Sequence, residues 1–357
     1  MKTYIKFIIN LFNISFLKIF TVFFFIIWIS GILEEVNFFK SININFFYLI
    51  FLSLLNTPSI VFEILPFIFL LSTQVFFISL INKNELEIFK YSGLNNFRII
   101  KVISVYALIL GLFFIVIFYN LSSVLKNSYL LIKNQYSNDN KYLAVITANG
   151  LWIKDEINDG INIINANKVD DEFLLDVSIA QFDKDFQILR IIQSKKVDIS
   201  NFKWKVFRPI ILQDNIENKK SELIFESNFD LKRINSLFSN LSSLSMIDLI
   251  NLRKSYKALN YSVIEIDSHL YKIFSYPFYL TLITIFSATV MFNIGYQKNS
   301  FFKITLGILL SVIIYYVNYF INILGINQKI PVFLSILLPL ILLTIINFTS
   351  IIKLNEK

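Results

Sequence analysis

Long apolar runs occupy both ends of this sequence and leave its middle polar, and this pattern limits the possible folds more than any other feature. A stretch of about 20 apolar residues is long enough to cross a bilayer as a helix. Only 16% of the residues are charged, whereas about a quarter are charged in typical soluble proteins. We therefore predict an integral membrane protein with spans at 19–33, 60–82, 102–119, 271–293, 301–322 and 331–351.

Two further helices are predicted at the membrane surface. Residues 3–17 mix lysines with apolar residues, which favours an amphipathic helix that leads into the first span. The apolar stretch 46–82 is too long for one straight span, so we assign 46–57 to an interfacial helix and 60–82 to the second span. Pro66 is expected to kink that span, because proline lacks the backbone N–H that an inner turn needs.

Residues 120–265 have a different character, with more charge and with apolar and polar residues in alternation. Short alternating segments separated by turns are typical of an all-β sandwich or jelly roll. We predict that Phe202, Trp204 and Val206 share the buried face of one strand. The predicted strands are 185–193, 196–200 and 202–207, and a connector helix is predicted at 245–260.

Short-loop lysines and arginines indicate the orientation in the membrane. They gather at the N-terminus, at 83–101, at 295–303 and at the C-terminus, and basic loops favour the cytoplasm. The predicted fold is thus an α-helical membrane protein with six transmembrane helices and an inserted periplasmic β-jelly-roll domain. The predicted domains are 1–119, 120–265 and 266–357.

Several kinds of chemistry are excluded or disfavoured by what the sequence lacks. It has no cysteine and a single histidine, His269, which removes thiolate metal sites and most histidine sites. No phosphate-binding G-x-x-x-x-G-K-[ST] motif and no G-x-S-x-G motif occurs. The net charge of +8 is scattered, which does not favour nucleic-acid binding. We expect neither a cofactor nor catalytic activity.

Two polar residues beside apolar runs have alternative interpretations. Glu63 is either a functional carboxylate within the membrane or a residue at the outer rim that faces water, and we favour the rim. For His269 we favour a structural role over a catalytic one, because Asp267 lies two residues away and therefore on a different helix face.

The polar loop between the second and third spans has helical spacing. Leu86, Phe89 and Lys90 share one side of this predicted helix, whereas Glu85 and Ile88 share another. The Ser92-Gly93 pair is a helix-ending signal. The segment is either a solvated loop or a coupling helix that inserts into a partner protein.

Together with this loop, a series of motifs along the chain resembles the LptF/LptG (YjgP/YjgQ) family of lipopolysaccharide-export permeases. The motifs are Pro58, Pro66, Asn84-Glu-Leu86, Ser92-Gly93, Gly150-Leu-Trp-Ile-Lys-Asp155 and His269-Leu-Tyr-Lys272 with Ser275 and Pro277. They cover essentially the whole chain in order. Ser30-Gly-Ile-Leu-Glu-Glu35 and Leu151-Trp152 are more similar to LptG than to LptF.

The resemblance implies a permease subunit of an inner-membrane ABC transporter. Its implied partners are the ATPase LptB, the paralogous permease, LptC, the periplasmic protein LptA and the substrate lipopolysaccharide. Helix 85–93 would then couple to the ATPase through Glu85, Leu86, Phe89 and Gly93. An open edge of the β domain would dock a neighbouring jelly roll.

The resemblance also bears on the polar end of the substrate. Where LptG-type proteins tend to carry a basic residue, this chain has Glu34 and Glu35. Either this end of the first span does not bind the substrate phosphate, or Lys40 binds it instead. A second interpretation of the whole chain is a membrane receptor or assembly factor whose β domain binds a partner. MacB- or FtsX-like permeases, which usually have four spans, are a third.

Overall fold

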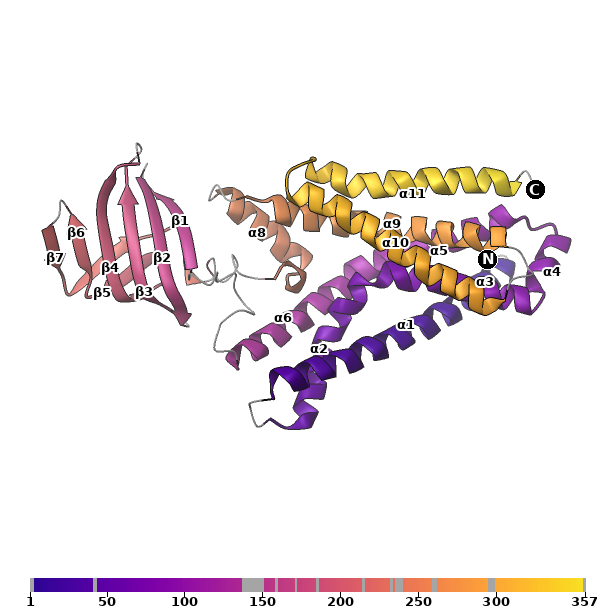
Figure 1. Ribbon diagram of the computed structural model, residues 1–357, viewed down its shortest axis with the longest axis horizontal. Coiled ribbons are helices and arrows are strands. Elements are labelled where there is room, and N and C mark those ends of the chain that lie inside the picture. Colours follow the sequence, from indigo (N-terminus) through magenta and orange to yellow (C-terminus); the bar gives the residue numbers. More distant parts are fainter. Residues whose placement is uncertain are drawn as a thin grey trace. The chain divides into compact units, whose positions relative to one another are not determined.

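The structure, a computed structural model, consists of two compact units. It describes residues 3–40, 44–136, 151–157, 160–170, 172–183, 186–213, 216–231, 234, 240–258, 262–294 and 299–355. The helical unit comprises Met1–Tyr129 and Ile264–Lys357, and the β unit comprises Leu130–Val263 (Figure 1). The β unit is therefore inserted between the two halves of the helical unit along the chain, as predicted.

The helices follow the apolar runs, and most of the membrane helices are longer than predicted, although the helix Leu65–Asn82 is shorter than the predicted span 60–82. They are α1 (Thr3–Phe38), α2 (Phe46–Glu63), α3 (Leu65–Asn82), α4 (Glu85–Tyr91), α5 (Asn96–Phe113), α6 (Asn120–Gln135), α8 (Met246–Ala258), α9 (Ile264–Ile294), α10 (Ser300–Ile326) and α11 (Val332–Asn355). A π-helical segment, η1 (Phe114–Tyr119), joins α5 to α6. In the described part of the chain, seven helices are long and apolar enough to cross a membrane when α5 to α6 counts as one.

The N-terminal segment and the first span form one helix rather than two. α1 runs through 36 residues, about 54 Å at 1.5 Å per residue, so it exceeds the roughly 30 Å hydrocarbon core. α2, which we predicted as an interfacial helix, is the additional helix of spanning length. It packs on α1, where the Ser53 hydroxyl donates to the Trp28 carbonyl at 2.9 Å and the Trp28 indole to the Ile50 carbonyl at 3.3 Å.

The predicted kink at Pro66 is a full break between two helices. α2 ends at Glu63, α3 begins at Leu65, and Pro66 lies in the first turn of α3. Proline is tolerated there because the first-turn N–H groups have no partner within the helix, and further along its ring would clash with the carbonyl four residues before. The break separates the two halves of the apolar stretch 46–82.

The third span continues past residue 119, where the sequence predicts the change to β structure. α6 extends the same helix to Gln135, and no glycine or proline interrupts it. Ser122, Ser123, Tyr129, Leu130 and Lys133 are its buried residues. The polar residues of this segment reflect an amphipathic helix rather than a change of fold.

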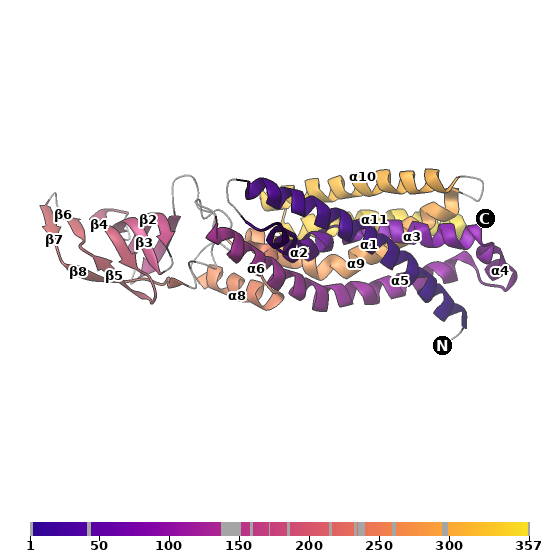
Figure 2. The same cartoon turned by 90° about the horizontal axis from the view of Figure 1, so that it is seen from below.

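The helical unit has two distinguishable ends. At one end lie α4, the start of α10 and the end of α11 (Figures 1 and 2), and we call this the loop end. The other is the end at which the chain leaves through α6 and returns through α9, and we call it the domain end. α3 runs toward α4 and α10 runs away from it, so these two helices are antiparallel.

The β unit contains one eight-stranded antiparallel sheet in its described residues. Its strands are β1 (Leu151–Ile157), β2 (Gly160–Asp170), β3 (Phe173–Phe182), β4 (Ile188–Asp198), β5 (Lys203–Phe207), β6 (Ile210–Gln213), β7 (Ile216–Lys219) and β8 (Glu222–Glu226). β4 pairs with β3 on one side and with both β5 and β6 on the other. The sheet therefore divides after β4, and its two branches are β5–β8 and β6–β7.

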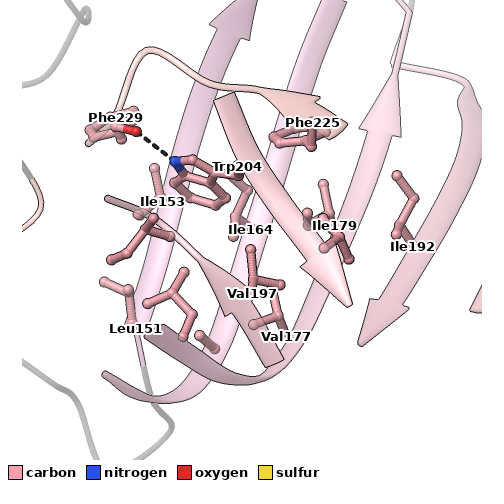
Figure 3. Packing of buried hydrophobic residues seen from close by; sticks show 14 of the residues in the cluster. Leu151, Ile153, Ile164, Val177, Ile179, Ile192, Val197, Trp204, Phe225 and Phe229 are labelled. Carbon is pink, nitrogen blue, oxygen red and sulfur yellow. Dashed lines mark hydrogen bonds between the residues drawn. The ribbon is translucent and has the colours of Figure 1, made fainter. Parts of the chain in front are cut away.

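Residues from both branches close over one hydrophobic core. Trp204 of β5 is fully buried, and its indole N–H donates to the Phe229 carbonyl at 2.6 Å (Figure 3). Phe225 of β8 and Ile211 of β6 belong to the same cluster. Burying a side chain of this size contributes on the order of 2–3 kcal/mol, and the indole bond removes the cost of burying its polar atom.

The strand predictions need two corrections. Residues 188–193 and 196–198 of the two predicted segments belong to one strand, β4, because Ser194 does not form a turn but bonds to the Lys196 and Phe207 carbonyls where the strand changes partners. Asp185 lies outside the described residues. Trp204 and Val206 are buried as predicted, but Phe202 is 46% exposed because it precedes the first residue of β5. The connector helix is confirmed as α8.

Candidate functional site

A cavity of about 470 Å³ lies within the helical unit, between α3, α9, α10 and α11. Most of its lining is apolar and comes from residues far apart in the sequence, among them Phe23, Phe67, Leu70, Ile283 and Leu340. Its polar lining residues are Glu63, Lys272, Ser275, Tyr276, Tyr279, Ser311, Tyr315, Tyr316, Asn318, Tyr319 and Asn322.

The two charged lining residues and the deepest apolar ones lie at different depths. Glu63 at the end of α2, Lys272 near the start of α9 and Asn322 near the end of α10 all lie toward the domain end. Ile283 lies roughly 16 Å from Lys272 along α9, at a rise of 1.5 Å per residue, and Leu70 lies within α3. The cavity thus has a polar mouth at the domain end and an apolar floor near the middle of the spans.

Charge at the mouth is arranged around Glu63. This carboxylate is exposed, and it interacts electrostatically with Lys126 of α6. Its position at the rim of the membrane stays a prediction. Lys272 is also exposed and lines the same cavity. The Tyr276 hydroxyl donates to the Phe62 carbonyl beside them. Ionic groups at the end of an apolar cavity suit an amphiphile that has a charged head and hydrocarbon chains.

His269 makes a contact between helices that suits the structural role we favoured, and that role stays a prediction. Its Nε2 atom and the Tyr119 hydroxyl are 3.1 Å apart, and this hydrogen bond joins α9 to the π-helical segment. Tyr119 is buried and its ring packs on Phe62. Among the described residues, no group of three or more His, Cys, Asp or Glu side chains is placed to hold a metal ion.

The residues that the sequence suggested for the polar end of the substrate do not line the cavity. Glu34 and Lys40 are exposed near the end of α1. Glu35 is instead buried, and its Oε1 atom accepts a hydrogen bond of 2.7 Å from the Tyr129 hydroxyl of α6. Glu35 therefore ties α1 to α6.

The predicted coupling helix is α4, and its end is built as predicted. Gly93 has φ +77°. The Leu94 N–H donates to the Phe89 carbonyl at 2.9 Å, and the Gly93 N–H to the Lys90 carbonyl at 3.0 Å. This pair of bonds is the Schellman arrangement, which favours glycine at the left-handed position.

The apolar side chains predicted to reach a partner from α4 face the chain itself. Leu86 is 2% exposed, and the Phe89 ring packs edge-on against Phe7 at 5.9 Å. The helix turns a different face outward, on which Ile88 is 58% and Tyr91 89% exposed. Leu86 and Phe89 therefore seat α4, and Ile88 and Tyr91 are the large apolar side chains left open to a partner.

The Leu151–Asp155 segment is β1, and its carboxylate has a structural role. Asp155 is fully buried. It accepts hydrogen bonds from the Ser227 hydroxyl at 2.8 Å, the Asn228 backbone N–H at 3.1 Å and the Asn228 side-chain amide at 2.8 Å. Gly150, the first residue of this motif, lies outside the described residues. The motif thus fixes the end of β8 to β1.

Sequence reasoning missed most of the cavity. The sequence feature that could have pointed to the cavity is the set of three tyrosines in the apolar run of α10, Tyr315, Tyr316 and Tyr319, all of which line it. The rings of Tyr315 and Tyr319 stack at an interplanar angle of 12°. Lys272 was noted only as part of a motif.

One family model matches almost the whole chain. The family described as the lipopolysaccharide export system permease LptF/LptG matches residues 6–353. This description includes LptF and LptG alike, so the preference for LptG stays a prediction. A comparison with curated proteins finds no match.

Proposed function

Because this chain belongs to the LptF/LptG family of lipopolysaccharide export permeases, we propose that it takes lipopolysaccharide from the inner membrane and passes it to a periplasmic bridge, driven by a separate ATPase subunit. It is a multi-pass membrane permease of that export system. In the proposed assembly it pairs with the paralogous permease, LptB binds at the cytoplasmic side, and LptC and LptA receive the lipid.

The cavity is the observation that carries this proposal. Withdrawing hydrocarbon chains from a bilayer costs about 0.8 kcal/mol per methylene, so a lipid leaves at a useful rate only into another apolar environment. The floor around Leu70 and Ile283 offers that environment, and the mouth at Glu63 and Lys272 offers charged groups to the head. The β unit follows the domain end along the chain, which suits transfer outward.

The test of this role compares two neighbouring positions on α10. Tyr319 lines the cavity, whereas Phe320 is 66% exposed and does not line it. A photoreactive residue at position 319, in cells expressing the full chain, is expected to cross-link to lipopolysaccharide. The same residue at 320 is expected to give bulk phospholipid alone. Equal lipid products at both positions would contradict the proposed role of the cavity.

The ATPase contact is proposed for α4. Glu85 lies in its first turn, where an acidic side chain is favoured by the helix dipole. The exposed Ile88 and Tyr91 supply an apolar surface for helix-in-groove recognition. Leu86, Phe89 and Gly93 hold the helix in place rather than touch the partner.

Copurification tests this contact. Ile88→Ser is expected to reduce recovery of the ATPase with the full chain, and Glu85→Ala to uncouple ATP hydrolysis from lipid release without loss of membrane insertion. Phe97→Ala is the matched control, because Phe97 is 43% exposed in the same region but belongs to α5. If all three variants recover the ATPase equally and transport normally, α4 is not the coupling helix.

The β unit is proposed to dock its neighbours through its edges. Among the described strands, β1, β7 and β8 each pair with one neighbour only. An edge strand can accept a strand from a neighbouring β domain. Replacing residues 136–258 by a short linker should therefore abolish association with LptC, and a truncated chain that still assembles and exports lipid would refute the docking role.

A further inference from the structure

α10 is held in the helical unit by an unusual seam. Although it has 27 residues and an apolar composition, only Lys303, Gly307, Ser311 and Gly325 are buried. The first three recur every four residues and therefore lie along one face. Gly307 and Ser311 are small residues, and small residues on such a face let two membrane helices approach closely.

The partner of this seam is Gln74 of α3. A Cβ atom added at Gly307 would overlap the Gln74 side-chain amide, so the glycine is the seat on which that amide rests. Gln74 is fully buried. Its Oε1 and Nε2 atoms have no hydrogen-bond partner among the described residues. A buried amide that bonds nothing is rare in proteins, because it loses its hydrogen bonds to water without replacing them.

The Ser311 hydroxyl, which can both donate to and accept from this amide, lies one turn along α10 from Gly307. α3 and α10 run antiparallel, so the pairing of Gln74 with Gly307 also brings Leu70 opposite Ser311. Both of these residues line the cavity, which agrees with this pairing. A shift of α10 by about 5.4 Å, one helical turn, toward the loop end would bring Ser311 opposite Gln74 and Tyr315 opposite Leu70.

We propose that Gln74 is a positioning residue on which α10 takes two places one turn apart. One is the seat seen here at Gly307, and the other is a seat at Ser311, where the serine hydroxyl satisfies the amide. When Gln74 lies opposite Gly307, its amide has room but no hydrogen bond. When it lies opposite Ser311, the serine hydroxyl provides the hydrogen bond. Such one-turn steps between two packed arrangements are a known form of conformational change.

The shift would change the cavity, and this consequence rests on the proposed function. Ser311 lies beside the apolar floor in the present arrangement, and Tyr315 lies nearer the mouth. Moving α10 one turn toward the loop end puts the tyrosine ring where the serine was. The floor then loses volume, so a hydrocarbon chain held there is displaced toward the mouth.

Disulfide trapping tests the two places, and the chain is suited to it because it contains no cysteine. In native membranes, the full chain with Leu70→Cys and Ser311→Cys reports the present place. The chain with Leu70→Cys and Tyr315→Cys reports the shifted one, since a disulfide needs Cα atoms within about 7 Å. Both disulfides are expected to form on mild oxidation.

Gln74→Met is the deciding variant, because it keeps the length of the side chain and removes its hydrogen bonding. It is expected to suppress the 70–315 disulfide and to leave the 70–311 disulfide intact. Gly307→Ala is expected to act oppositely and to raise the 70–315 yield, because its methyl group occupies the first seat. A 70–315 disulfide that never forms, or that forms equally with Gln74→Met, overturns the proposal.

These yields are read without any transport assay. Failure here leaves the cavity and its cross-linking to lipopolysaccharide untouched. The opposite result is also distinguishable. If the photoreactive residue at 319 captures no lipopolysaccharide while the two disulfides behave as described, the two positions of α10 are supported and the proposed function is contradicted.

Discussion

Replacing Asp155 by alanine should loosen the β unit, because three hydrogen-bond donors converge on this buried carboxylate. In the alanine variant, the Ser227 hydroxyl and the backbone and side-chain N–H groups of Asn228 lose their acceptor. Each unsatisfied buried group costs about 1–3 kcal/mol. Asn228 is only partly buried, so water can replace part of what it loses.

We expect a loss of about 3 kcal/mol for Asp155→Ala and about 2 kcal/mol for Asp155→Asn. The asparagine can keep its acceptor oxygen for the Ser227 hydroxyl and the Asn228 backbone N–H, but it turns its NH2 group toward the Asn228 side-chain amide, which donates to Asp155 in the wild-type chain. Lys154→Ala is the control, because neighbouring strand residues point to opposite faces and the Lys154 side chain is exposed. Such a surface change stays within about 1 kcal/mol.

Hydrogen exchange on the full chain in detergent measures these differences locally. A loss of about 3 kcal/mol in the free energy of opening speeds exchange on the order of a hundredfold. The β1 amides should show this acceleration in Asp155→Ala, a smaller one in Asp155→Asn and almost none in Lys154→Ala. If Asp155→Ala exchanges like the control, the carboxylate does not hold β1 to the end of β8.

Four further outcomes follow from the same structure. A cysteine at Asn158 should react only with reagents applied outside the cytoplasm, and labelling from the cytoplasm alone would reverse the topology. Gly93→Ala should cost about 1 kcal/mol, since φ is +77° and no atom crowds the site; faster exchange at the end of α4 measures it. Hydrogen bonds from Ser200 lower the pKa of Asp198, so Asp198→Asn should destabilise the β unit at neutral pH, and unfolding midpoints should converge as pH falls through that lowered pKa. A photoreactive residue at Lys40 should capture lipopolysaccharide if that lysine binds phosphate, and bulk phospholipid alone would exclude it.

The parts of the fold that the sequence predicted are those set by local chemistry. Pro66 divides the stretch 46–82 because of its own ring, and Gly93 ends α4 because of its own φ. Trp204 and Val206 are buried because strand residues alternate. The sequence predicted that Leu86 faces a partner, but the side chain is buried. Only contacts with the rest of the helical unit decide which face of a short helix is turned inward, and the sequence does not contain them.

Polar residues inside the apolar runs show why the cavity stayed hidden. The Thr73 and Thr284 hydroxyls bond to carbonyls four residues earlier in their own helices, at 2.7 and 2.9 Å, so they need no neighbour and mark no site. Ser287 instead reaches the Leu70 carbonyl of α3, at 2.8 Å. Both kinds look alike in a sequence, and only helix packing separates them.

Gln74 belongs to neither kind, and this makes it informative. Its amide is too long and too polar to be a packing residue beside Gly307, yet it finds no partner among the described residues. A side chain that only filled space would be replaced at lower cost by leucine or methionine, since a hydrocarbon loses no hydrogen bonds on burial. An amide is favoured at this place only if it is bonded in some arrangement of the helices, and the hydroxyl one turn along α10 is the group that supplies that bond after a single step of the helix.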